Sequence, residues 1–210
     1  MSTRKETFAL GEFYHLYNRG TEKRKIFLDN QDYQHFLFLM YICNTTRNID
    51  TRRIGEDFDR EVLLVNMGAY CLMPNHFHIL ITEKNEGGIS KFMLKLMTAY
   101  AMYFNKKYER SGKLCEGTFK STHLNTDNYL KYLYSYIHLN PAKLIDKNWR
   151  KNNSKDTLKL LDYTFNYQYS SMTEYKNNKF TILNTEKFPN YFKSILSHKK
   201  ELFDWLSLDY

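Results

Sequence analysis

Two histidines, His76 and His78, are the residues of this sequence whose type and spacing most directly suggest chemistry. They flank Phe77 and lead into the apolar run 79–81. Alternate side chains of a β-strand point to the same face, so the spacing predicts both imidazoles on one side of a strand and Phe77 in the core on the other. Neutral imidazole is the commonest metal ligand, which makes the pair a candidate metal site. Two ligands do not fill a coordination sphere, so the alternative is a pair that only satisfies local hydrogen bonds.

A predicted helix over residues 127–139 could supply a third metal ligand beside the two histidines. Tyr136 lies off the apolar stripe of this helix, and Asn140 continues the same side one turn later, just before Pro141. A tyrosine hydroxyl and an amide oxygen so arranged can reach one small object, such as a cation held by the histidines. The alternative is that Tyr136 only packs and Asn140 only ends the helix. The apolar stripe consists of Leu130, Leu133, Tyr134 and Ile137.

The charge balance favours a polyanionic partner. Lysine and arginine outnumber acidic residues 31 to 23 in a chain of 210 residues, which gives a net charge of +8. Nucleic acid is the first candidate. A membrane partner is not expected, since no apolar stretch is long enough to span a bilayer and the first residues lead into no secretory signal. The protein is expected to be cytoplasmic. The three cysteines form no Cys-x-x-Cys pair, so neither a disulfide framework nor a thiolate zinc site is indicated.

The elements that must position these residues alternate between strands and helices. Strand patterns cover residues 12–18, 62–73, 76–82 and 114–124, and helical patterns cover residues 29–43, 90–110 and 127–139. Pro74 and Asn75 form a tight link that favours a hairpin between the second and third strands. The order predicts a ferredoxin-like α+β sandwich, βαββαβ, with a four-stranded antiparallel sheet and an added helix. Residues 1–145 are expected to form this domain, and residues 146–210 a C-terminal helical extension packed on it.

Two motifs carry a family resemblance. The first reads Tyr-Cys-Leu-Met-Pro-Asn-His-Phe-His-Ile-Leu over residues 70–80, and the second reads Tyr-Ile-His-Leu-Asn-Pro over residues 136–141. Together with further motifs from residues 14–20 to 170–171, they resemble the single-tyrosine HUH transposases of the insertion-sequence-200-like group, especially the REP-associated tyrosine transposases. The resemblance implies the ferredoxin-like fold with a catalytic helix behind the sheet, a divalent metal, and cleavage of single-stranded DNA next to hairpins.

The resemblance also assigns roles to residues of the candidate site. It implies that His76, His78 and Asn140 hold the metal and that Tyr136 is the nucleophile, which would form a 5′-phosphotyrosine. Either Mg²⁺ or Mn²⁺ is the expected cofactor, because two imidazoles favour Mn²⁺ in affinity whereas Mg²⁺ is more abundant.

Basic residues near the first and fourth strands are expected to contact DNA phosphates, although a charged run is usually only a solvated surface. Where relatives often carry other residues, this chain has Cys115, Glu116 and Thr118, which bears on DNA contact and target choice. The predicted DNA-binding residues are Arg19, Lys23, Arg24, Lys113 and Lys120.

Five further histidines are expected to be structural or surface residues: His15, His35, His123, His138 and His198. Among them, His123 and His138 lie near enough to the site in sequence to be reserve candidates.

The leading hypothesis is a metal-dependent single-stranded DNA endonuclease and strand transferase, a transposase acting near hairpins as a monomer or homodimer. One alternative is a non-catalytic nucleic-acid-binding protein that retains the fold. Another is a hydrolase in which the histidine pair binds zinc and Tyr136 is a bystander, although the sequence offers no further acidic or Cys/His motif for it.

Overall fold

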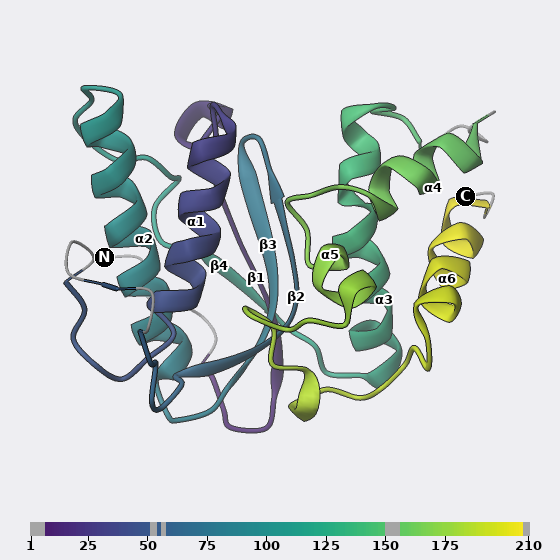
Figure 1. Ribbon diagram of the computed structural model, residues 1–210, viewed down its shortest axis with the longest axis horizontal. Coiled ribbons are helices and arrows are strands. Elements are labelled where there is room, and N and C mark those ends of the chain that lie inside the picture. Colours follow the sequence, from purple (N-terminus) through teal and green to yellow (C-terminus); the bar gives the residue numbers. More distant parts are fainter. Residues whose placement is uncertain (1–6, 51–53, 56–57, 150–155, 208–210) are drawn as a thin grey trace.

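A four-stranded antiparallel sheet forms the centre of the protein. The computed structural model describes residues 7–50, 54–55, 58–149 and 156–207. The strands β1 (Phe13–Arg19), β2 (Val65–Met73), β3 (His76–Glu83) and β4 (Lys120–His123) lie in the order β2-β3-β1-β4. Helices α1 (Asn30–Ile42) and α2 (Gly88–Lys107) cover one face, and α3 (Asp127–Leu139) covers the other (Figure 1). This arrangement confirms the predicted ferredoxin-like α+β sandwich with its added helix.

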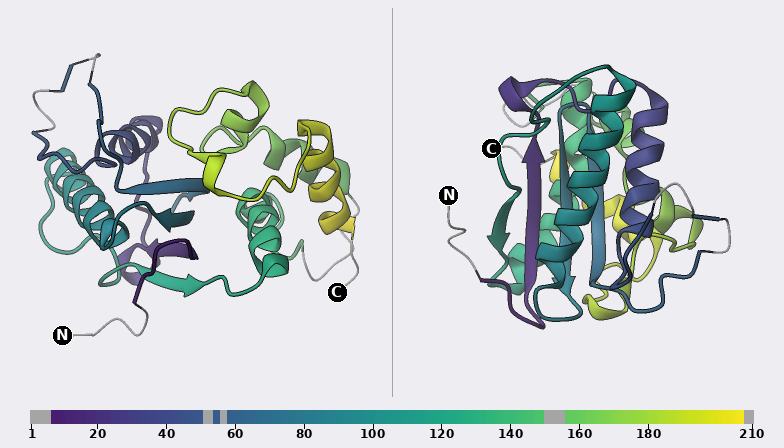
Figure 2. Two further views of the ribbon diagram at one scale, coloured as in Figure 1. Left: turned by 90° about the horizontal axis from the view of Figure 1, so that it is seen from below. Right: turned by 90° about the vertical axis from the view of Figure 1, so that its left-hand side faces the viewer.

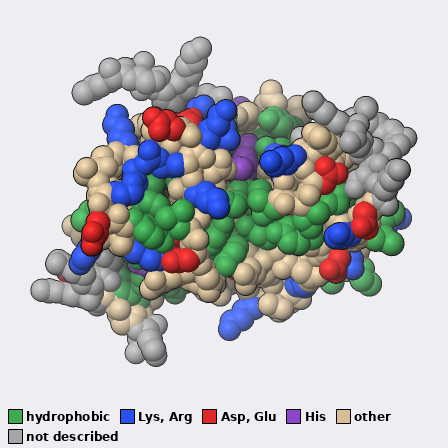
Figure 3. Space-filling model, turned by 90° about the horizontal axis from the view of Figure 1, so that it is seen from above, with side chains coloured by type: hydrophobic (Ala, Val, Ile, Leu, Met, Phe, Trp, Pro, Cys, Tyr) green, Lys and Arg blue, Asp and Glu red, His purple; other side chains and the backbone are tan. Residues whose placement is uncertain are grey.

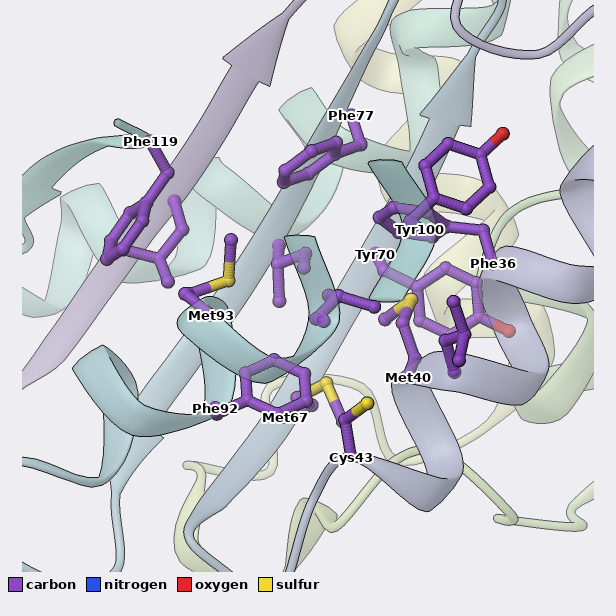
Figure 4. Close-up of a cluster of buried hydrophobic side chains, with 14 of the residues drawn as sticks. Phe36, Met40, Cys43, Met67, Tyr70, Phe77, Phe92, Met93, Tyr100 and Phe119 are labelled. Atoms are coloured by element: carbon purple, nitrogen blue, oxygen red, sulfur yellow. The ribbon is translucent and has the colours of Figure 1, made fainter. Parts of the chain in front are cut away.

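The main core lies between the sheet and the helices α1 and α2. Phe77, Ile79 and Ile81 are fully buried there, as the alternation along β3 predicts. The Phe77 ring packs 5.3 Å from the Phe36 ring, and Figure 4 shows both residues in one cluster with Tyr100. The residues that alternate with them along β3, the histidine pair included, lie on the opposite face, where α3 packs.

The predicted apolar stripe of α3 packs against β2 and β3. Thr126 caps the helix, since its side chain accepts a hydrogen bond from a backbone N–H of the first turn. Pro141 lies just past the helix end, where the chain tightens into the short helix η2 (Asn140–Leu144). Gly68 of β2 lies close to α3, since an added Cβ there would lie 2.7 Å from the Tyr134 hydroxyl and 2.9 Å from the Phe188 ring. The stripe residues Leu130, Leu133, Tyr134 and Ile137 are all buried.

The later part of the chain adds helices on the α3 side of the sheet, as Figure 2 shows. These are α4 (Thr157–Phe165), α5 (Met172–Asn177), η3 (Thr185–Lys187) and α6 (Ile195–Ser207). None of the helices in the described ranges has the length and apolar character that a membrane crossing requires. The division of the chain at residue 145 stays a prediction.

The segment 167–171 runs along the outer edge of β2. The Tyr167 hydroxyl donates a hydrogen bond to the Leu72 carbonyl at 2.9 Å, and the Ser171 backbone N–H donates to the Tyr70 carbonyl at 3.0 Å. A strand at the edge of a sheet otherwise presents a row of unpaired backbone groups. This segment therefore covers the β2 edge of the sheet.

Two predicted elements have different starting points. The strand predicted over residues 62–73 begins at Val65, because the Asn44 side chain accepts hydrogen bonds from the backbone N–H groups of Leu64 and Val65, both at 3.0 Å. The helix predicted from Ser90 begins at Gly88, after the left-handed Gly87 with φ of 71°.

The strand predicted over residues 114–124 was too long, since only β4 is paired as a strand. Cys115 forms a single antiparallel bridge with Gly20. The chain then turns at Gly117, whose φ of 66° lies in the left-handed region that glycine adopts without strain. This turn interrupts the apolar pattern before β4 joins β1.

Candidate active site

The histidine pair and Tyr136 meet at the end of the sheet where the β2–β3 hairpin turns. His76 and His78 lie on the α3 face of β3, with 5.0 Å between their ring centroids. The Tyr136 ring centroid is 5.3 Å from that of His78, and the two rings are nearly perpendicular, at 83°. Figure 3 looks onto this end and shows histidine surface near its centre, with Lys and Arg side chains around it. The fold thus brings a strand and a helix that are far apart in sequence to one place.

An open cleft of about 410 Å³ lies over these residues. Two of the predicted DNA-binding residues, Arg19 and Lys120, line it together with Tyr17 of β1. The antiparallel register explains this grouping, because Arg19 pairs with His76 and Lys120 pairs with Tyr17, so their side chains share the α3 face. The cleft is lined by Tyr17, Asn18, Arg19, His76, His78, Glu116, Lys120, Tyr136 and Lys143.

The other three predicted DNA-binding residues lie outside this lining. Lys23 and Lys113 are exposed. Arg24 is half-buried, and its guanidinium donates to the Thr21 carbonyl at 3.1 Å and lies 3.6 Å from the Glu22 carboxylate. The Arg24 side chain therefore interacts with residues of its own turn.

His76 is held by the residue before it. Its Nδ1 lies 2.6 Å from the Asn75 Oδ1, and an amide oxygen only accepts, so this Nδ1 carries the proton. The lone pair is then on Nε2. Burial lowers the pKa of His76 to about 4, and the charges of Lys143 and Arg19 act in the same direction. At neutral pH the ring is uncharged, which is the form that binds a metal.

His78 is held by a histidine from the neighbouring strand. Its Nδ1 lies 2.8 Å from the Nε2 of His15. Burial, followed by the nearby His15, His76 and Lys143, holds the pKa of His78 well below its usual value. Within the described part of the chain, its Nε2 is buried and has no hydrogen-bond partner. A buried nitrogen without a partner is costly, and a bound cation would satisfy it.

Asn140 connects to the cleft through Lys143. The Asn140 Nδ2 donates to the Tyr136 carbonyl at 2.9 Å, and its Oδ1 accepts a hydrogen bond from the Lys143 Nζ at 3.0 Å. Lys143 lines the cleft, with its Nζ 5.5 Å from the centroid of the Tyr136 ring. An amide oxygen has two lone pairs, so the bond from Lys143 leaves one for a cation. The metal-ligand role of Asn140 stays a prediction.

The donor set is compatible with a hard divalent ion. Among the residues that the structure describes, no group of three or more His, Cys, Asp or Glu side chains is placed to hold a metal. A third protein ligand beside His76 and His78 would therefore be of another type, as the Asn140 amide is. Two imidazoles and an amide oxygen suit Mn²⁺ or Mg²⁺, with open positions left for water or phosphate oxygens.

Two residues of the site were not singled out by the sequence pattern. His15 was expected to be structural or on the surface, yet its ring contacts His78 and lies 5.8 Å from that of Tyr136. Lys143 was not assigned a role. The sequence signal for His15 was its place on a strand with alternating side chains, and the signal for Lys143 was its spacing of three residues from Asn140.

The two reserve histidines lie elsewhere. His123 pairs with Tyr14 in the β1–β4 ladder, which puts it on the face opposite His15, and its Nε2 lies 2.6 Å from the Glu12 carboxylate. His138 is completely buried between the Ser171 hydroxyl, 2.8 Å from its Nε2, and His198, 3.2 Å from its Nδ1. Both were wrong as reserve candidates, since strand register and helix rotation point them away from the cleft.

The chain is similar to known proteins in sequence and in fold. A family model described as transposase, IS200-like, matches residues 14–140, a range that includes the histidine pair and Tyr136. A solved structure of a REP-associated tyrosine transposase bound to a REP hairpin is 12% identical, with 92% of this chain and 96% of that chain covered and a TM-score of 0.50. At this identity the likeness shows the fold.

A second solved structure, a bacterial tRNA(His) guanylyltransferase-like protein in complex with ATP, is also 12% identical. It covers 97% of this chain and 94% of its own, with a TM-score of only 0.40. No match was found among curated proteins.

Proposed function

Because the chain belongs to the IS200-like transposase family, we propose that it cleaves and rejoins single-stranded DNA next to hairpins, with Tyr136 as nucleophile and a divalent metal as cofactor. The observation that carries this proposal is the contact of Tyr136 with His78, 5.3 Å between ring centroids, in a cleft that opens to solvent. A phenol beside a neutral imidazole that can hold a metal suits this chemistry, because a metal ion or base near the phenol favours its ionised form.

The reaction is a transesterification. The Tyr136 oxygen forms a bond to phosphorus while the bond from phosphorus to the 3′ oxygen breaks. The phenol proton passes to water, and the departing oxygen takes a proton from water to become a 3′ hydroxyl. The energy of the ester bond is kept in the 5′-phosphotyrosine, so a second 3′ hydroxyl can reverse the step and rejoin DNA without a nucleotide cofactor.

The metal would be held by this chain through His76 Nε2, His78 Nε2 and Asn140 Oδ1. When bound, a divalent ion polarises the non-bridging phosphate oxygens and stabilises the charge that develops on them. Lys143 keeps a positive charge near the Tyr136 ring, and a phenol needs a nearby cation or base to react in its ionised form.

DNA would lie in the cleft with its phosphates against Arg19 and Lys120. The solved relative is described as bound to a REP hairpin, and a hairpin next to the cleaved strand is the corresponding proposal for this chain. The net charge of +8 supports a nucleic-acid partner.

Trapping the covalent intermediate tests the proposal. The protein is incubated with Mn²⁺ or Mg²⁺ and hairpin-bearing single-stranded oligonucleotides labelled at the 3′ end, because a 5′-phosphotyrosine retains the strand on that side. A denaturing gel should show a labelled protein–DNA adduct with the native protein and none with Tyr136→Phe.

Tyr132→Phe is the matched control, since Tyr132 lies one turn earlier on the same side of α3, with 6.1 Å between its ring centroid and that of Tyr136. It should form the adduct. DNA binding without an adduct by the native protein would favour a non-catalytic nucleic-acid-binding protein, and hydrolysis without an adduct would favour a metallohydrolase.

A further inference from the structure

We propose that His15 is a positioning residue that fixes the orientation and proton position of His78, so that His78 presents a lone pair to the metal. The inference rests on the proposed function, because it concerns how the chain prepares the proposed metal site. His15 acts through His78 and not on the DNA.

The contact between the two rings is buried and specific. His15 is only 8% exposed and His78 only 6%. His15 pairs with Leu80 across the β1–β3 ladder, while His78 pairs with Tyr17, so the two histidines are diagonal neighbours on one face. Their rings are nearly parallel, at 28°, with 5.0 Å between centroids and 2.8 Å between His15 Nε2 and His78 Nδ1. Strand pairing therefore fixes both partners of this hydrogen bond.

The hydrogen bond between the two rings determines which nitrogen of His78 carries a proton. Two nitrogens at 2.8 Å share one proton, so one donates and the other accepts. If His15 Nε2 donates, the neutral His78 carries its own proton on Nε2, and that nitrogen cannot bind a metal. If His78 Nδ1 donates, the lone pair of His78 is on Nε2. Metal binding therefore requires His15 to accept.

When His78 Nδ1 donates to His15, the buried Nε2 of His78 has a lone pair that can bind a metal. This nitrogen has no hydrogen-bond partner within the described residues, and His78 lines the cleft. Metal-binding histidines almost always donate their other ring N–H to a neighbour, and loss of that neighbour typically weakens metal binding about 10- to 100-fold. His15 supplies this acceptor for His78, as Asn75 does for His76.

Measuring the Mn²⁺ affinity of variants distinguishes a positioning role of His15 from a role in packing alone. Mn²⁺ binding to the full chain without DNA can be followed by the loss of the free Mn²⁺ signal in electron paramagnetic resonance. His15→Leu keeps the volume and removes the acceptor, and it should bind Mn²⁺ about 10- to 100-fold more weakly than the native protein. His15→Gln places an amide oxygen near the position of Nε2 and should recover most of the affinity.

The matched control is His123→Leu, which removes a histidine from the same sheet but from the opposite face. It should bind Mn²⁺ as the native protein does. Nitrogen-15 spectra of the histidine rings, recorded before and after addition of the diamagnetic ion Zn²⁺, provide a second readout. On addition of the metal, the native protein should move toward a single Nδ1–H form of His78. Circular dichroism of each variant establishes that it is folded.

Equal Mn²⁺ affinity of folded His15→Leu and native protein would overturn the role of His15 while leaving the proposed function intact. Weaker binding by His15→Leu that His15→Gln does not restore would also overturn it, because loss of packing would then explain the effect. Absence of Mn²⁺ binding by the native protein would overturn the proposed metal and this inference together, whereas the Tyr136 adduct is judged by its own assay.

Discussion

At the residue scale, the candidate site depends on how each reactive group is held by a neighbour. Lys143 is the clearest case, since it donates to Asn140 and lies beside the Tyr136 ring. A cation in a partly buried site interacts more strongly with a developing negative charge than it would in water.

Lys143→Met is expected to slow adduct formation about 100-fold at saturating DNA, because the ionised phenol and the charged phosphate lose a fixed positive neighbour. Single-turnover kinetics with the labelled hairpin substrate measure this rate. Lys147→Met, which changes an exposed lysine shortly after η2, serves as the control and should react at the native rate. Equal rates for the two variants would remove Lys143 from the mechanism.

Not every part of the site could be predicted from sequence. The face shared by His76 and His78 follows from alternation within one strand, and the side occupied by Tyr136 follows from rotation along one helix. The pairing of His15 with His78 depends instead on the register between β1 and β3, and a slip of one residue would put His15 on the other face. Register between distant strands is not a local property of the sequence.

At the element scale, α3 is the part whose placement matters most for function. It carries Tyr136 and is seated against β2 at Gly68, where the Tyr134 hydroxyl and the Phe188 ring leave no room for a side chain. The helix itself was predictable from its apolar stripe and its cap. Its closeness to β2 was not, because it depends on packing between segments far apart in sequence.

Gly68→Ala should push α3 away from the sheet and so move Tyr136 relative to His78. We expect a loss of about 1–3 kcal/mol in the free energy of unfolding, since overpacking forces backbone shifts of this kind, together with slower adduct formation. Urea unfolding and the adduct assay measure the two effects. Gly55→Ala is the control, because an added Cβ there meets no atom of the described residues within 4 Å, and it should change neither quantity.

At the scale of the whole molecule, the chain buries four of its seven histidines, His15, His78, His138 and His198, and half-buries a fifth, His76. Burial lowers the pKa of each, to about 4 for His15 and His76, to about 3 for His198, and well below the usual value for the other two. The unfolded chain takes up these protons below about pH 6.5, whereas the folded chain does not.

Folding stability should therefore fall as the pH drops from about 6.5 toward 4, by up to about 1.4 kcal/mol per pH unit for each buried histidine. Urea unfolding at pH 7.5, 6.5 and 5.5 with a chelator present measures the dependence without metal linkage. Most carboxylates titrate below this range, so the slope reports mainly on histidine. Unfolding midpoints that stay constant between pH 7.5 and 5.5 would contradict the burial of these rings in neutral form.

The covering of the β2 edge by the segment 167–171 has a consequence during synthesis of the protein. The sheet can assemble once β4 has left the ribosome, but β2 then still has an open edge, because the residues that cover it follow α4 in the chain. Until the segment 167–171 emerges, the nascent chain carries a four-stranded sheet whose β2 edge is uncovered, the kind of surface that pairs with other chains. The β2 edge is thus protected only after all four strands and α4 have been made.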